Sequence, residues 1–240
     1  MQSCPKTQIT PAGEFFVNNL FFNRVAVVTS KQSWFLPYAE QFVQQLINLG
    51  ANSSFFTRYE DINNSPQVVF LLSYFSLVKA EELEKYKLNF VVHESNLPNG
   101  KGWAPVFWQV LENKNEIPIV LFEAVEEMDA GPIYIKDIII LDGSELHDEI
   151  RDITAMKTIA MCTRLLQEYS AIKPKSQIGK SSYYPKRTPA DSELDINKPL
   201  SKLFNQLRVA SNDLYPAFFY YRGIKYVLRI TKQNDAGLSD

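Results

Sequence analysis

The sequence has little of several residue types, and each shortage excludes a class of protein. Only two cysteines, Cys4 and Cys162, occur in 240 residues, too few for a disulfide framework or a cysteine zinc site. Apolar runs reach about five residues, whereas a membrane helix needs about 20. The first ten residues lack a charged start followed by an apolar stretch. We therefore expect no secretory signal, no membrane contact and a cytoplasmic location.

Neither sign of charge is in excess. The 25 Lys and Arg residues against 27 Asp and Glu residues give a formal net charge of -2. A protein that coats nucleic acid needs surplus cations to replace counterions along the phosphates, so we expect no nucleic-acid partner. Apolar residues make up 45% of the chain, which is enough to bury a sizeable core.

Apolar strand patterns alternate with helical patterns in the first half of the chain. The expected strands lie at residues 24–30, 53–56, 68–72 and 89–93, and the expected helices at 34–49 and 78–86. Such alternation is typical of an α/β fold with a doubly wound, mostly parallel sheet and flanking helices.

In the second half of the chain, the regular alternation of strand and helix patterns ends. The pattern predicts a helix over 105–113, strands over 117–125 and 133–141, and a long helix capped by Ser144. A helix over 200–208 and a hairpin of 217–221 with 225–230 would follow as a small appendage. The Pro-, Gly-, Ser- and Lys-rich stretch between them predicts a linker. The expected domains are 1–171, followed by a linker over 172–182 and a small C-terminal region over 183–240.

The chain has only two histidines, and their contexts differ. His93 ends a buried strand, where ligands of open α/β sheets bind; the alternative is a hydrogen-bonded core histidine. His147 lies on an amphipathic helix, so we expect it to be solvated. Asp129 lies between two apolar strands, where a plain hairpin turn would also explain it.

A loop rich in glycine and proline follows His93. Gly100-Lys101-Gly102 stands just before the expected helix at Pro105, and glycines there would let backbone N–H groups approach an anion. A plain turn explains the glycines but not the lysine between them. Walker, dinucleotide-binding, nucleophile-elbow and CxxC patterns are absent from the sequence.

Two strings resemble the family of N-formyltransferases that take their formyl group from 10-formyltetrahydrofolate. They are VVHESNLPNGKGWAPVFWQVL, beginning at Val91, and FEAVEEMDAGPIY, beginning at Phe122. The resemblance extends from about Arg24 to Tyr169. The positions that match the family pattern are His93, Ser95, Leu97, Pro98, Lys101, Gly102 and Pro105, followed by Asp129 and Gly131.

The sequence departs from that pattern beside the histidine. Val91 stands where the family has an asparagine, while Asn89 lies two residues further back, about 7 Å away along a strand. Asn89, Asn96 or a backbone amide remain candidates for the oxyanion donor. Val120 and Phe122 replace the usual threonine and histidine upstream of the aspartate.

The resemblance is closer to short enzymes that act on dTDP-linked amino sugars, through Ser33-Trp34 and YYPKRTPADSELD, which begins at Tyr183. It implies transfer of a formyl group from 10-formyltetrahydrofolate to the primary amine of a nucleotide-linked amino sugar. The best candidate is dTDP-4-amino-4,6-dideoxyglucose, used for bacterial O-antigen and lipopolysaccharide. The implied partners are folate and the nucleotide sugar, no metal is needed, and a homodimer is among the assemblies we expect.

The resemblance also implies roles for the domains and for individual residues. Residues 1–171 would form the catalytic domain, and 183–240 would complete the acceptor site. His93 would transfer protons, with Asp129 orienting its imidazole. Folate would lie between two segments: Tyr74, Phe75, Ser76 and Leu77, and Phe122, Glu123, Ala124, Val125, Glu126 and Asp129. The acceptor would contact Ser30, Lys31, Ser33, Trp34, Lys101, Gly102, Trp103, Tyr184 and Arg187. Core packing of Tyr74 and Phe75, an ordinary exposed Lys31 and a solvated linker end at Arg187 are the alternatives.

Two other functions compete with this one. A methionyl-tRNA or ribonucleotide-amine formyltransferase is the first, and for tRNA a broad basic face would be expected, which the net charge opposes. A non-catalytic, nucleotide-binding descendant of the fold is the second. Only Val91 supports it, and the intact His93 and Asp129 oppose it.

Overall fold

The computed structural model describes residues 20–233, so Cys4 and the expected absence of a leader lie outside the described part. A six-stranded sheet has the order β2-β1-β3-β4-β6-β7. Its strands are β1 (Arg24–Val28), β2 (Asn52–Phe56), β3 (Val68–Leu71), β4 (Leu88–His93), β6 (Glu116–Glu123) and β7 (Ile133–Ile140). The first four run parallel, whereas β6 and β7 are antiparallel to their neighbours.

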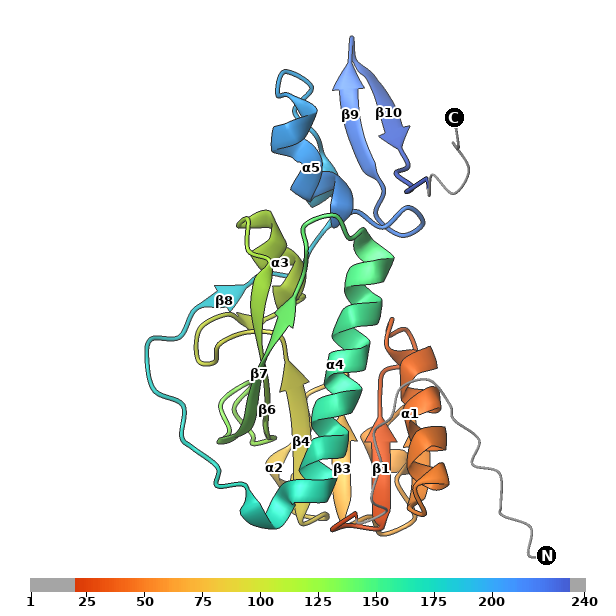
Figure 1. The fold of residues 1–240 in the computed structure, drawn as a ribbon, viewed down its shortest axis with the longest axis vertical. Helices are drawn as coiled ribbons and strands as arrows, with labels where there is room; N and C mark the ends of the chain where they lie inside the picture. Colours follow the sequence, from red (N-terminus) through yellow and green to blue (C-terminus); the bar gives the residue numbers. More distant parts are fainter. Residues whose placement is uncertain (1–19, 234–240) are drawn as a thin grey trace, which may run out of the picture.

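Helices cover both faces of the sheet, which confirms the predicted α/β fold. Helices α1 (Leu36–Asn48) and α4 (His147–Glu168) lie on one face, and the short α2 (Ala80–Leu83) packs on the other with the 3₁₀ turn Tyr59–Asp61 (Figure 1). Helix α3 (Pro105–Leu111) follows the loop after β4. No helix in residues 20–233 has the length and apolar character needed to cross a membrane.

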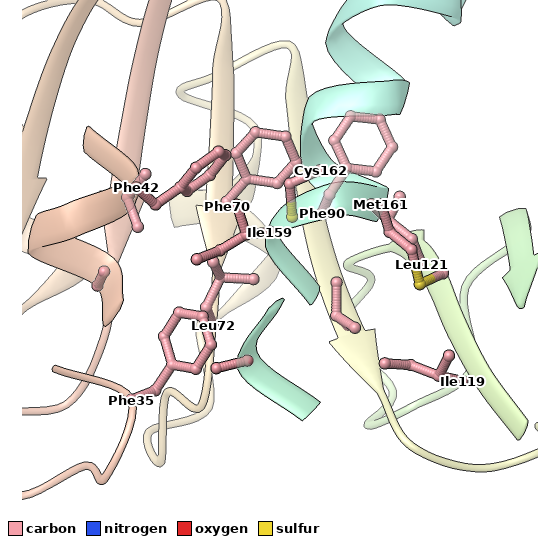
Figure 2. Close-up of a cluster of buried hydrophobic side chains, with 14 of the residues drawn as sticks. Phe35, Phe42, Phe70, Leu72, Phe90, Ile119, Leu121, Ile159, Met161 and Cys162 are labelled. Carbon is pink, nitrogen blue, oxygen red and sulfur yellow. The ribbon is translucent and has the colours of Figure 1, made fainter. Parts of the chain in front are cut away.

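The main core lies between the sheet and the helices α1 and α4. Figure 2 shows Phe42 of α1, Phe70 of β3 and Phe90 of β4 in one row, beside Ile159 and Cys162 of α4. Successive ring centroids are 6.0 and 6.1 Å apart, within the range of favourable aromatic pairs. The central strands therefore need apolar residues on both faces, which explains their unbroken hydrophobic runs.

The end of the chain forms a small unit with a core of its own. This C-terminal unit (residues 189–233) contains α5 (Leu200–Arg208) and the hairpin of β9 (Ala217–Tyr221) and β10 (Ile224–Leu228). Leu203 and Leu207 of α5 pack on the hairpin there. Before it, β8 (Tyr183–Tyr184) pairs in parallel with β5 (Lys101–Gly102), so the chain returns to the loop after β4.

Three predictions of local structure need correction, and two short strands were not predicted. Helix α2 has four residues, shorter than the predicted 78–86. Helix α4 begins at His147 rather than after Ser144, because the Glu145 carboxylate accepts the N–H groups of Asp142 and Gly143 and holds a separate turn. His147 is buried, not solvated. The two-residue strands β5 and β8 had no sequence pattern to indicate them.

Candidate active site

His93 and Asp129 meet at the carboxyl end of β4. The distance from His93 Nδ1 to Asp129 Oδ1 is 4.0 Å, and both side chains are nearly buried, with 8% and 11% exposed. Strand pairing alone would not bring them together, because β6 pairs Glu123 with Phe90, at the middle of β4. The segment after β6 therefore folds back along β4 to place the carboxylate near the imidazole.

The fold-back depends on close backbone packing at Gly131. A Cβ atom there would lie 1.8 Å from the Glu123 carbonyl oxygen, so no other residue fits without moving the backbone. The amide of Gln177 donates to the carbonyl oxygens of Asp129 (3.0 Å) and Gly131 (2.9 Å). Asp129 itself has φ 52°, a left-handed conformation that aspartate tolerates better than most residues. The predicted linker thus braces the hairpin that presents Asp129.

One hydrogen bond of His93 determines which ring nitrogen carries the proton in the neutral form. Nε2 lies 2.8 Å from the Gly100 carbonyl oxygen, which can only accept, so Nε2 carries the proton and donates. Nδ1 is then the unprotonated nitrogen, and it faces Asp129. A proton taken up at Nδ1 would produce an imidazolium beside a carboxylate, an arrangement suited to a general base.

The loop after β4 is held against Asp129 at Gly102. The Gly102 N–H donates to Asp129 Oδ2 at 3.0 Å. Its φ is +100°, and a Cβ atom would lie 2.5 Å from the Tyr184 carbonyl oxygen, so both conformation and space require glycine. Lys101 is buried and donates to Glu127 at 3.2 Å.

The two candidate asparagines lie in different surroundings. Asn89 is buried, and its amide donates to the carbonyl oxygens of Leu83 (2.9 Å) and Tyr86 (3.0 Å) while accepting from the Tyr59 hydroxyl (2.7 Å). Its donors are therefore both used. Asn96 is exposed, and its Oδ1 accepts from Lys136, which leaves its N–H groups for a ligand.

The two predicted folate segments differ in exposure. Tyr74 is half-buried and packs on the smaller core beside Ala124, and its hydroxyl accepts from the Tyr59 N–H at 3.2 Å. Phe122 is buried, and Glu123 is half-buried and accepts from the Tyr134 hydroxyl. Ala124 and Asp129 are half-buried, and five members are exposed to solvent: Phe75, Ser76, Leu77, Val125 and Glu126.

Residues after β1 contact the β3 loop. Ser30 is buried and its hydroxyl accepts from the Phe75 N–H at 2.8 Å, while the Phe75 ring lies 5.6 Å from that of Trp103. The buried Ser33 hydroxyl accepts from a backbone N–H within its own turn, and Lys31 is exposed. The turn after β1, the β3 loop and the start of α3 therefore adjoin one another.

A second group surrounds Phe107 of α3. Arg187 lies with its guanidinium carbon 5.8 Å from the Phe107 centroid, and Arg151 of α4 approaches the same ring at 5.7 Å. Arg151 also lies 4.9 Å from the centroid of Trp34, and His147 stacks on Phe107 at 4.9 Å. No motif in the sequence indicates Arg151, which is one of two arginines on α4.

Glu94 follows His93 directly and is another residue that the patterns did not indicate. Burial raises the pKa of its carboxyl above the usual value, against the opposing effect of the neighbouring His93.

Tyr184 stacks on Trp108, with centroids 6.3 Å apart, and its hydroxyl donates to Glu112 at 2.9 Å. Within residues 20–233, no three His, Cys, Asp or Glu side chains gather as metal ligands would.

No protein-family model matches the chain. A methionyl-tRNA formyltransferase from Pseudothermotoga lettingae is 32% identical over 148 residues, which cover 60% of this chain and 48% of that protein. The chain therefore spans about half the length of the curated relative that it matches.

Solved structures agree in fold. A methionyl-tRNA formyltransferase from Clostridium thermocellum superposes with TM-score 0.71 at 19% identity, covering 89% of this chain and 95% of that one. A sugar N-formyltransferase from a Shewanella species gives 0.64 at 12% identity, covering 88% and 98%. HypX from Aquifex aeolicus in complex with tetrahydrofolic acid gives 0.70 at 14% identity, covering 86% and 37%. The chain thus has the formyltransferase fold, and its predicted resemblance to the formyltransferase family is confirmed.

Proposed function

We propose that the protein is a folate-dependent N-formyltransferase. The observation that carries this proposal is the position of His93 Nδ1, held 4.0 Å from the Asp129 carboxylate at the carboxyl edge of the sheet while Nε2 contacts the Gly100 carbonyl oxygen. A base in that position suits an amine acceptor, which must lose a proton when it attacks a carbonyl carbon. The similarity to a methionyl-tRNA formyltransferase supports the same chemistry.

The transfer would proceed by addition and elimination. The acceptor nitrogen attacks the formyl carbon of 10-formyltetrahydrofolate, a new C–N bond forms, and the carbonyl electron pair moves to oxygen. His93 Nδ1 takes the proton from the attacking nitrogen, and Asp129 stabilises the resulting imidazolium. The bond to folate N10 then breaks, and N10 receives the proton. Proton transfer of this kind typically contributes about 10²- to 10⁴-fold.

The tetrahedral oxyanion needs a hydrogen-bond donor. The Asn89 amide already spends both of its N–H groups on carbonyl oxygens, which disfavours it. We therefore assign the oxyanion to the Asn96 amide or to a backbone N–H of the loop after β4. Tetrahydrofolate would occupy the space beside the segments 74–77 and 122–129, since their exposed members are available for contact.

For the acceptor we propose a nucleotide-linked amino sugar, with a dTDP sugar such as dTDP-4-amino-4,6-dideoxyglucose first. The supporting observations are local cations and aromatic rings near the site, Arg187, Trp103 and Tyr184, on a chain with net charge -2. A broad basic face for tRNA would need a surplus of cations. Residues 183–233 would complete this acceptor site. Use in O-antigen or lipopolysaccharide synthesis would follow from such a product.

Methionyl-tRNA is the second candidate acceptor, because the curated relative and one of the similar solved structures are named methionyl-tRNA formyltransferases. The test incubates the full chain with 10-formyltetrahydrofolate and, separately, dTDP-, UDP- and GDP-linked amino sugars and methionyl-tRNA. Mass spectrometry identifies the formylated product, and the His93→Asn variant serves as the control. We expect formylation of a nucleotide sugar, fastest with dTDP. Formylation of methionyl-tRNA alone would replace the sugar assignment, and no formylation at all would favour a non-catalytic protein.

A further inference from the structure

Two arginines from distant parts of the chain share one aromatic ring. Arg151 lies in the second turn of α4, and Arg187 lies in the segment between β8 and the C-terminal unit. Their guanidinium carbons are 5.7 and 5.8 Å from the Phe107 centroid. Arg151 is also 4.9 Å from the Trp34 centroid, so α4, α3 and the turn after β1 converge here. Both arginines are half-buried.

Neither charge is matched by the described residues. Over residues 20–233, no carboxylate lies within 4.0 Å of either guanidinium. The Nε atom of each is buried and has no hydrogen-bond partner in the same range. Arg187 donates from Nη1 to the Val209 carbonyl oxygen at 2.9 Å. By contrast, the buried Arg208 uses Nε, Nη1 and Nη2 in hydrogen bonds.

Two of the nearby acids have other partners. Asp148 accepts from the His147 ring at 2.7 Å, and Asp191 accepts from the Thr188 N–H and hydroxyl. Burial lowers the pKa of Arg151 to about 10, and the charge of Arg187 acts in the same direction. Both arginines still carry their charge at neutral pH. Partly buried cations without counterions are costly, so a bound anion would offset that cost.

We propose that Arg151 and Arg187 together bind the diphosphate of the nucleotide-linked acceptor, an assignment that rests on the proposed function. A small rotation of each side chain would bring its unpaired Nε–H, with the adjacent Nη–H, onto a phosphoryl group in bidentate geometry. Because two guanidinium groups lie on the same ring, the pair fits a diphosphate better than a single phosphate group. Phe107 follows the loop whose Gly100 and Gly102 contact His93 and Asp129. The sugar amine would therefore extend from this diphosphate site toward His93.

The binding test uses inorganic pyrophosphate and the full chain. Isothermal titration calorimetry would compare the wild type with Arg151→Gln, Arg187→Gln and the matched control Arg164→Gln. Arg164 lies on the same helix, but it is exposed and paired with Glu168. We expect each of the first two variants to weaken pyrophosphate binding by about tenfold or more, because each loses charge-assisted hydrogen bonds, while the control binds as the wild type does.

Two outcomes would overturn the site. One is a wild type that fails to bind pyrophosphate, and the other is an Arg151→Gln variant that is folded by circular dichroism and binds as well as Arg164→Gln. Competition identifies the source of the phosphate: we expect dTDP to displace pyrophosphate. Displacement by bulk tRNA but not by dTDP would also overturn the diphosphate assignment.

Kinetics separate this proposal from the proposed function. With the nucleotide amino sugar that the wild type formylates as the acceptor, we expect Arg151→Gln to raise its KM by about tenfold or more with a smaller change in kcat. An unchanged KM would contradict the proposed arginine site without contradicting the formyltransferase activity. If pyrophosphate binding depends on both arginines but no acceptor is formylated, the proposed function is contradicted and the anion site is supported.

Discussion

Arg208 attaches the C-terminal unit to the rest of the protein, and replacing it should be strongly destabilising. It is the last residue of α5 and is 1% exposed. Its Nη2 donates to the Glu145 carboxylate at 2.7 Å, its Nε to the Glu145 carbonyl oxygen at 2.9 Å, and its Nη1 to Asn115 at 3.0 Å. Arg208→Met keeps much of the volume and removes these hydrogen bonds and the charge.

The expected cost follows from what is left behind. Removing one partner of a buried ion pair typically costs about 3–5 kcal/mol. Glu145 keeps the N–H groups of Asp142 and Gly143, so we expect a loss near the lower end, about 3 kcal/mol. For a chain of this size, that loss lowers the melting temperature by about 6–12 °C.

Differential scanning calorimetry and urea unfolding measure this loss. Arg164→Met is the control, since its exposed pair with Glu168 should contribute about 0.5 kcal/mol or less. The double variant Arg208→Met/Glu145→Gln should be more stable than Arg208→Met alone, because no buried charge remains unpaired. If Arg208→Met costs no more than Arg164→Met, the buried pair does not stabilise the docking of the C-terminal unit.

Three further changes test separate parts of the structure. Gly102→Ala should lower turnover by about tenfold or more, because its Cβ would meet the Tyr184 carbonyl oxygen at 2.5 Å; wild-type kinetics would refute the close approach. Asn89→Ala should cost about 1–3 kcal/mol in urea unfolding, with kcat reduced far less than by loss of His93. If kcat falls as much as it does on loss of His93, Asn89 is instead the hydrogen-bond donor to the oxyanion. Burial lowers the pKa of His147 below its unfolded value, so this residue resists protonation in the folded state and stability falls as pH drops below about 6.5. His147→Gln should flatten that slope, and an unchanged slope would contradict it.

The sequence allowed the sheet to be predicted because its central strands are covered on both faces. Val68–Leu71 is an unbroken apolar run, and the structure buries all of it between two helical layers. Helix α5 was predicted with the bounds observed, since its apolar stripe packs on a single hairpin. In these elements, local pattern and tertiary environment agree.

The site was only partly predictable, because its geometry depends on contacts between distant segments. His93 could be identified from its place at a strand end. The position of Asp129 beside the end of β4 depends on Gly131 and Gln177, and the hydrophobic pattern of the sequence does not indicate either residue. Arg151 resembles any surface arginine in the sequence, and only Arg187, 36 positions later, makes it unusual.

The most direct test of the account is the single-turnover rate of formyl transfer by His93→Asn and Asp129→Asn. The assay uses 10-formyltetrahydrofolate and the best nucleotide amino sugar, and circular dichroism verifies that each variant is folded. We expect both rates to fall by at least about 10²-fold, because one variant lacks the base and the other lacks the carboxylate facing it. A folded variant that keeps more than about a tenth of the wild-type rate would contradict the roles assigned to His93 and Asp129.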